Sequence, residues 1–307
     1  MVPYFQGPAI HGICKMIVQW YPGHMNKARK MMEEDIKLVD MVIEVLDARA
    51  PIASRNPDIK KLSRGKPDLI LLNKADLADE RASKEWKKYF EDEKTRVVFL
   101  NSKNKEGLRE VLPAVKELTR EKTERDLKRG IKNQPVRAMV VGIPNVGKST
   151  FINAFAGKNI AKTGNKPGVT KGKQWIKLSK DLELLDTPGI LWPKFEDQEI
   201  GKKLAYLGSI NDEILVTEEL AGALLLYLFE NYADLLKERF DITAEDVLTE
   251  SEEQFSTKES RMLDKIAIKR GILKPGGVPD YFKTSGMVLD EFRNGKIGKI
   301  TLERPNE

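Results

Sequence analysis

The chain is poor in the residues that build disulfides and most transition-metal sites. Its 307 residues include one cysteine and two histidines. Cys14 and His11 both fall within the stretch MVPYFQGPAIHGICK, which has no secondary-structure periodicity and contains YFQG, a sequence like part of a protease-cleavage tag. We interpret residues 1–15 as a leader or tag and Met16 as the natural start. The remaining chain then has no cysteine and one histidine, His24, which excludes disulfides and cysteine metal sites and is typical of a reducing compartment such as the cytoplasm.

Long hydrophobic runs are also lacking. No stretch of about 18 or more apolar residues occurs, so the sequence predicts no transmembrane helix. Apolar residues nevertheless make up 40% of the chain, although only 7% of all residues are aromatic. This apolar content is sufficient for a folded core, and a length of 307 residues predicts about two domains.

Acidic residues are scarce in the first part of the chain and abundant in the last. Residues 1–209 contain 40 Lys and Arg against 27 Asp and Glu, whereas residues 210–307 contain 13 against 20. The basic first part is compatible with a polyanionic partner. An ordinary solvated surface explains the same charge equally well, so composition alone does not identify a partner.

The first 208 residues alternate apolar runs of strand length with helix-like segments. We predict strands over 41–48, 68–74, 96–102, 137–143, 174–178 and 182–189, with the last two forming a hairpin, and helices over 24–37, 83–93 and 106–130. Strands that alternate with helices indicate an α/β domain with a mostly parallel sheet covered on both faces.

The pattern becomes helical after residue 208. We predict helices over 217–240 and 258–271, followed by another helix and a short extended tail. The sequence therefore predicts an α/β domain over 16–208 and a mainly α-helical domain over 209–307.

A glycine-containing turn after the predicted strand 137–143 has the spacing of a phosphate-binding loop. Residues 142–149, GIPNVGKS, match G-x-x-x-x-G-K-[ST] and lead into a predicted helix. In such loops backbone N–H groups point at phosphate oxygens, the lysine (here Lys148) reaches the β- and γ-phosphates, and the hydroxyl (here Ser149) binds Mg²⁺. The predicted nucleotide contacts of this loop are Asn145, Val146, Gly147, Lys148, Ser149 and Thr150.

Two further segments fit the metal and the γ-phosphate. DTPG at 186–189 ends a predicted strand, where Asp186 can hold Mg²⁺ and the Gly189 N–H can bind the γ-phosphate. The Gly- and Lys-rich segment 164–173 contains Thr170, which we predict as a further Mg²⁺ ligand. An ordinary flexible loop is the alternative interpretation of this segment.

A second strand end carries a candidate base-recognition site. NKAD at 73–76 follows an apolar run, and the Asp76 carboxylate can accept hydrogen bonds from guanine N1–H and N2–H₂, which adenine does not offer. Lys74 can pack along the base, and Asn73 can tie the segment to the phosphate loop. The contacts predicted after the next strand, in a loose match to a second guanine-binding loop, are Ser102 and Lys103.

The order of these motifs is unusual, because both base segments precede the phosphate loop. A parallel sheet tolerates such a circular permutation if the original chain ends lie close together and a new segment joins them. The predicted helix over 106–130 and the polar segment 131–135 can form that join.

Together and in this order, the motifs resemble those of the circularly permuted GTPases, most closely the bacterial ribosome biogenesis GTPase A family (RbgA, or YlqF). The resemblance rests on WYPGHM (20–25), DARAP (47–51), SRNP (54–57), NKADL, GIPNVGKST, KPGVT, DTPGILWP, RGILKPGGVPDY and LDEFRNGKIGKITLE. It implies a P-loop GTPase domain, which binds GTP or GDP with Mg²⁺, and a C-terminal helical domain.

The resemblance also implies a function. Members of this family act in late assembly of the large (50S) ribosomal subunit, and ribosomal particles stimulate their GTP hydrolysis. The implied partners are ribosomal RNA and ribosomal proteins in the cytoplasm, and we expect the chain itself to be a monomer. A nucleotide-gated RNA-binding module with incidental hydrolysis is the alternative, whereas an ATPase is disfavoured by Asp76.

One catalytic residue of Ras-like GTPases is absent. The glutamine that orients the attacking water follows D-x-x-G in those proteins, and here that position is Ile190. His24 is the candidate replacement, with a structural or RNA-contacting role as the alternative. The resemblance further suggests that Asn145 helps to bind K⁺ near the β- and γ-phosphates; simple shaping of the loop is the alternative.

Overall fold

The computed structural model describes residues 24–305 apart from 64, 133, 159, 161–173, 190, 192–196 and 249–256. The side chains of residues 24–29, Gln174 and Ile214 also lie outside this description. The predicted leader over 1–15 and the residues Thr170 and Ile190 therefore fall outside the described residues. For His24 only the backbone is described, and it is the first residue of a helix.

The described residues form two compact units. The sheet unit comprises the described residues up to Asn211 together with the chain from Lys299 onward, and the helical unit spans Asp212–Gly298. Among the described helices, none is long and apolar enough to cross a membrane.

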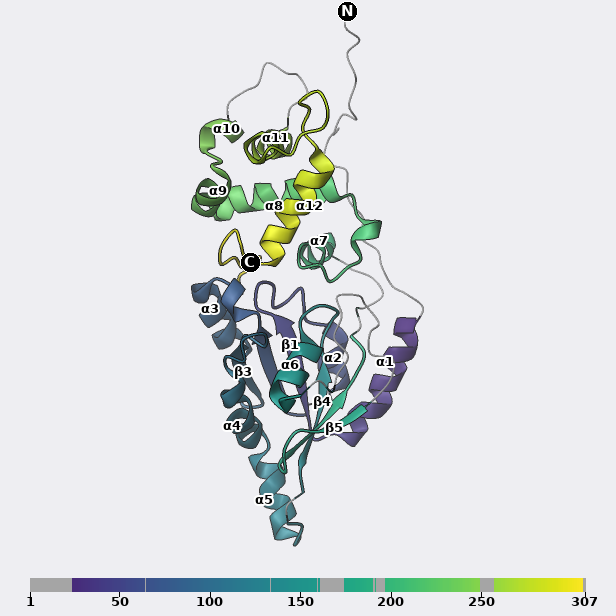
Figure 1. Cartoon of the computed structure of the whole chain (residues 1–307). Coiled ribbons are helices and arrows are strands. Elements are labelled where there is room, and N and C mark those ends of the chain that lie inside the picture. Colours follow the sequence, from purple (N-terminus) through teal and green to yellow (C-terminus); the bar gives the residue numbers. More distant parts are fainter. Residues whose placement is uncertain are drawn as a thin grey trace, which may run out of the picture. The chain divides into compact units, whose positions relative to one another are not determined.

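The sheet unit contains six described strands in the order β3-β2-β1-β4-β6-β5 (Figure 1). Their bounds are β1 Met41–Asp47, β2 Asp68–Asn73, β3 Thr95–Leu100, β4 Val136–Val141, β5 Gln174–Lys177 and β6 Leu182–Asp186. Neighbouring strands are parallel except for β5, which pairs antiparallel with β6. The predicted α/β fold with a mostly parallel sheet is confirmed, and so is the predicted hairpin of β5 and β6.

The apolar content of the strands explains their central position. All seven residues of β1 are buried, so both faces of this strand are covered. The flanking helices are α1 His24–Asp35, α2 Pro57–Leu62, α3 Glu80–Phe90, α4 Leu108–Leu118, α5 Arg120–Lys128, α6 Lys148–Ala156 and α7 Gln198–Tyr206, with 3₁₀ turns η1 Ile36–Leu38 and η2 Ala75–Leu77. Helices α3 and α4 run beside β3 (Figure 1).

The prediction of a single helix over 106–130 is wrong in one respect. The structure has two helices there, α4 and α5, which are separated at Thr119. The buried Thr119 hydroxyl donates to the Val115 carbonyl at 2.7 Å, and the backbone leaves helical geometry at this residue. A threonine that bonds back to the preceding turn bends a helix in this way. The segment after the break has no buried residue.

The helical unit is built around one apolar helix. Its elements are η3 Asp212–Ile214, α8 Thr217–Asn231, α9 Ala233–Phe240, α10 Ala244–Leu248, α11 Lys258–Arg270 and α12 Tyr281–Arg293. Helix α8 packs against α11 and α12, and Gly222 permits a close approach because a Cβ there would lie 2.9 Å from the Glu259 Cβ. The helix predicted over 217–240 is interrupted at Tyr232, where the backbone is non-helical.

The last residues of the chain return to the sheet unit. The sequence pattern predicts one helical domain over 209–307, whereas the contacts place Lys299 and the following residues with the sheet. Ile300, Thr301 and Leu302 are buried there, and the Trp86 indole N–H of α3 donates to the Glu303 carbonyl at 3.1 Å. The sequence pattern does not reveal this return because the partners lie more than 200 positions away.

Arg55, Glu44 and Asp68 form a largely buried charge cluster near the beginning of β2, and this cluster leads to a stability prediction. Arg55 contacts Glu44 at 2.6 Å and Asp68 at 2.9 Å, and Glu44 is almost fully buried. Arg55→Leu leaves both carboxylates without their cation, so we expect the free energy of unfolding to fall by about 3 kcal/mol. The matched control is Arg96→Ala, which breaks an exposed pair with Glu117 and should cost less than about 1 kcal/mol. Equal losses for the two variants in urea unfolding would contradict this assignment.

Candidate nucleotide-binding site

Five parallel strands end at the same edge of the sheet, and the predicted site residues, together with Asp47, lie at or just after those ends. Asp47 ends β1, Asn73 ends β2 and Asp186 ends β6, while Ser102 lies just after β3 and the phosphate loop just after β4. Ligands of open α/β sheets bind at this carboxyl edge. The fold therefore brings the separate base and phosphate segments of the sequence to one place.

The phosphate loop depends on backbone geometry that its glycines allow. Gly147 has φ +93°, and a Cβ there would collide with the Asn73 amide. A Cβ on Gly142 would lie 2.7 Å from the Val45 carbonyl oxygen. Helix α6 begins at Lys148, so its unpaired N–H groups and the half-buried Ser149 and Thr150 stand at the end of this loop. A helix N-terminus of this kind favours phosphate.

Lys148 and Asp186 form a buried ion pair. Burial lowers the pKa of Lys148, and the negative charge of Asp186 partly offsets that effect. The two residues predicted for phosphate and for metal are therefore in direct contact.

The donors for a metal ion are few. Among the described residues, no group of three or more His, Cys, Asp or Glu side chains lies together. The hydroxyl of Ser149 and the carboxylate of Asp186 suit Mg²⁺, which usually takes one or two protein oxygens and completes its coordination with phosphates and water.

The DTPG turn packs directly on the phosphate loop. The buried Thr187 hydroxyl donates to the Val140 carbonyl at 2.8 Å, which fixes the turn to β4. A Cβ on Gly189 would lie 3.2 Å from Pro144 N and 3.3 Å from Gly142 O, so the glycine permits this approach. The backbone of Gly189 is thus close to the loop that would hold the phosphates.

The Asn73 side chain joins three parts of the site. Its amide nitrogen donates to the Val146 carbonyl at 2.7 Å, which is the predicted tie to the phosphate loop. Its amide oxygen accepts from the Ser102 backbone N–H at 3.1 Å and from the Ser102 hydroxyl at 2.8 Å. Asn73 and Ser102 are both buried, so these bonds fix the ends of β2 and β3 against the loop after β4.

Lys74 makes a second link between the base and phosphate segments. Its φ of 58° is left-handed, and its ammonium group contacts the Asp47 carboxylate at 2.8 Å and the Asn145 carbonyl at 2.7 Å. Arg49 binds the same carboxylate through two nitrogens, each at 2.9 Å. Burial by itself raises the pKa of Asp47, but Arg49 and Lys74 outweigh burial and hold it below its ordinary value.

Sequence reasoning missed this role of Asp47 and Arg49. Their DARAP segment served only as a mark of family resemblance, although a paired Asp and Arg directly after a buried strand was a usable signal. The predicted base contacts Asp76 and Lys103 are exposed, on η2 and just after β3 respectively. They are thus open to a ligand at the same edge.

Asn145 also has a contact that the sequence did not predict. Its backbone is left-handed, with φ 64°, and its side-chain nitrogen donates to the Gly208 carbonyl, two residues after the end of α7. The phosphate loop is therefore linked to the segment that leads out of the sheet unit.

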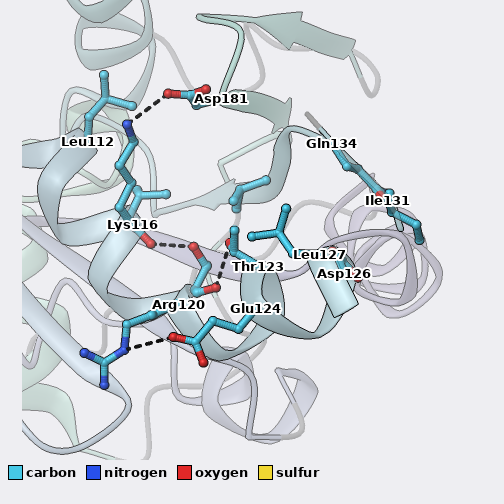
Figure 2. A pocket seen from close by; sticks show the side chains of 13 residues that line it. Leu112, Lys116, Arg120, Thr123, Glu124, Asp126, Leu127, Ile131, Gln134 and Asp181 are labelled. Carbon is cyan, nitrogen blue, oxygen red and sulfur yellow. Dashed lines mark hydrogen bonds and ion pairs between the residues drawn. The ribbon is translucent and has the colours of Figure 1, made fainter. Parts of the chain in front are cut away.

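A cavity at the opposite edge of the sheet is not part of this site. It has a volume of about 410 Å³ and lies beside α4, α5 and the start of β4 (Figure 2). Its charged side chains pair locally, with Lys116 to Asp181 at 3.0 Å and Arg120 to Glu124 at 4.0 Å. This mixed charge does not favour a polyphosphate.

Removal of the Asn73 amide tests the link between the two halves of the site. Asn73→Ala leaves the Val146 carbonyl and the Ser102 N–H without a buried partner, so we expect a loss of about 1–3 kcal/mol of stability. We also expect at least about tenfold weaker GDP binding in calorimetry, because both loops lose their alignment. The control Asn104→Ala changes a neighbouring exposed residue and should alter neither quantity. Unchanged GDP affinity in Asn73→Ala would disprove the link.

Comparison with known proteins agrees with this geometry. A family model described as 50S ribosome-binding GTPase matches residues 137–260. Ribosome biogenesis GTPase A from Bacillus cereus is 47% identical over 95% of this chain and 95% of its own length, and the Thermotoga maritima protein of the same name is 35% identical over 94% and 95%.

Solved structures support the same assignment. The GNP-bound YlqF from T. maritima is 31% identical, with a TM-score of 0.60 over 92% of this chain and 99% of that chain. The GDP-bound YlqF is 30% identical, with a TM-score of 0.62 over 90% and 100%. The family resemblance predicted from the motifs is thereby confirmed, and this chain is a GTP-hydrolysing enzyme that belongs to the ribosome biogenesis GTPase A family.

Proposed function

We propose that this GTPase acts in late assembly of the bacterial large (50S) ribosomal subunit, with slow hydrolysis by itself and faster hydrolysis on ribosomal particles. The observation that carries the proposal is the family membership, since the relatives are named for ribosome biogenesis and the family model for 50S binding. The partners are ribosomal RNA and ribosomal proteins, and the protein acts as a monomer in the cytoplasm.

The nucleotide site works through its own charged groups. Asp76 accepts from guanine, with Lys103 and Ser102 beside the base, and backbone N–H groups of residues 145–150 receive the phosphates. With nucleotide bound, Lys148 would contact phosphate oxygens in place of Asp186, and Asp186, Ser149 and Thr170 would hold Mg²⁺. Each buried charge keeps a partner throughout, which avoids the cost of leaving a charge unpaired. A bound Mg²⁺ neutralises charge that develops on the phosphates.

The attacking water needs a group from outside the DTPG turn. The residue after Gly189 is Ile190, an aliphatic side chain that cannot orient water. We assign this role to His24, with a group of the ribosomal partner as the alternative, and a K⁺ ion held near Asn145 would add positive charge at the β- and γ-phosphates.

Replacement of His24 tests its role. We expect His24→Ala to lower the rate of GTP hydrolysis by about tenfold or more, because the imidazole no longer positions water. Nucleotide affinity should stay nearly unchanged, since the base and phosphate contacts are elsewhere. The measurement is single-turnover hydrolysis beside GDP titration. A large loss of affinity would instead identify His24 as structural.

Exposed basic residues offer a surface for ribosomal RNA. Helix α5 has no buried residue, and Arg125, Lys128, Arg129 and Lys132 are exposed at its C-terminal end. Lys30 of α1 is also exposed, and the side chains of Lys27 and Arg29 on the same helix are not described. Lys and Arg on such a surface bind RNA phosphates with strong salt dependence.

The proposed function is tested by GTP hydrolysis in KCl with and without purified large ribosomal subunits. We expect strong stimulation by the subunit, because the partner completes the active site. A parallel series in NaCl tests the K⁺ site and should show slower hydrolysis. Tight GTP binding without stimulation would favour the alternative, a nucleotide-gated RNA-binding module.

A further inference from the structure

The C-terminal tail, residues 299–304, contacts the loop that carries Asp76. The Ile300 N–H donates to the Leu77 carbonyl at 3.0 Å, and the Thr301 hydroxyl accepts from the Asp79 N–H at 3.0 Å. Ile300 and Thr301 are each only 1% exposed. The tail thus bonds the carbonyl of Leu77, the last residue of η2, and the N–H of Asp79 just after it.

The same tail holds the loop that follows β1. The Leu302 N–H donates to the Arg49 carbonyl at 2.7 Å. The nearly buried Glu303 carboxylate accepts from the N–H groups of Ile52 at 3.2 Å and Ala53 at 3.0 Å. Arg49 and Lys74 both pair with the Asp47 carboxylate. The bond from Leu302 to Arg49 is therefore linked through Asp47 to Lys74 of the base segment.

Further contacts anchor the tail on α3. The Glu303 carbonyl accepts from the Trp86 indole, and Arg304 pairs with Asp79 at 3.0 Å. Trp86 belongs to the core cluster that also contains Leu46 and Ala82. Chain ends normally fray unless they are tied down, and this one is tied down by buried backbone bonds.

These contacts fix the end of a short turn whose beginning is fixed elsewhere. Asn73 and Lys74 hold the start of η2 against the phosphate loop, and the tail holds Leu77 and Asp79 at its end. Asp76 lies between the two supports and is itself exposed. A carboxylate selects its ligand only if its own position is held closely, and that is the task of the surrounding residues.

We infer that the tail positions Asp76 for guanine recognition, with Thr301 as the key positioning residue. This inference rests on the proposed role of Asp76 in binding the guanine N1–H and N2–H₂ groups. Without the tail the turn becomes mobile, GDP dissociates faster, and the enzyme discriminates less well against a base that lacks the 2-amino group.

The test compares Thr301→Val with Thr301→Ser in the full-length protein. Valine keeps the shape of threonine but removes the hydroxyl that accepts from Asp79, whereas serine keeps that hydroxyl. Dissociation of fluorescent GDP is measured by stopped flow, and affinities for GDP and inosine diphosphate are measured by competition. We expect Thr301→Val to raise the GDP dissociation rate about tenfold and to lower the preference for GDP over inosine diphosphate. Thr301→Ser should behave like the parent protein.

Two controls separate positioning from loss of stability and from failure of the base site. Ile176→Ala shortens a buried side chain on β5, at the far edge of the sheet from β3, and should lower Tm without changing the preference for GDP. Asp76→Ala should abolish that preference.

The outcomes are distinct. If Asp76→Ala abolishes the preference but Thr301→Val leaves it intact, the inference about the tail is overturned while the base site stands. If Asp76→Ala keeps the preference, the base site and the inference both fail. Should Thr301→Val fold poorly, Glu303→Gln weakens the hold on the loop after β1 and is expected to cause a smaller change in the same direction.

Discussion

The nucleotide site depends first on a single buried amide. Asn73 stands at the end of β2, and its hydrogen bonds reach Val146 in the phosphate loop and Ser102 after β3. Both partners are far away in sequence, and the bonds lie in a buried environment where an unmade hydrogen bond is costly. The base and phosphate halves of the site therefore keep a fixed spacing, whatever the order in which the chain supplies them.

Buried charge forms a second layer around this amide. Asp47 is shared between Arg49 and Lys74, and Lys74 also bonds the carbonyl of Asn145. Because a buried carboxylate needs such partners, Asp47 draws the loop after β1 towards the base segment and the phosphate loop. Lys148 and Asp186 follow the same rule, because each of these two buried charges has the other as its partner.

Two segments of the sheet unit, one shortly before Asn211 and one from Lys299 onward, bond to loops of this site. The chain leaves the sheet unit at Asn211, shortly after Gly208 accepts a hydrogen bond from Asn145. It returns at Lys299 and then bonds the loops on either side of the base segment. The sheet unit thus binds its own chain at both of these points, once at the phosphate loop and once beside the base loop.

The sequence by itself determined the chemistry of the site. The glycines at 142 and 147, Lys148 at the start of the helix, and the NKAD and DTPG segments are readable because their roles depend on local backbone freedom and side-chain type. The alternation of strands and helices was readable for the same reason, since burial imposes a period on neighbouring residues. Only the tertiary structure decided the partners of Asp47 and Arg49, the contact of Asn145 with Gly208, the break at Thr119 and the return of the tail. The contacts of Asp47 with Lys74, of Asn145 with Gly208 and of the tail with the sheet unit join groups that lie far apart in the sequence, so no local pattern carries that information. At Thr119 and in the pair of Asp47 and Arg49 the partners are local, and burial in the folded structure decided that these bonds form.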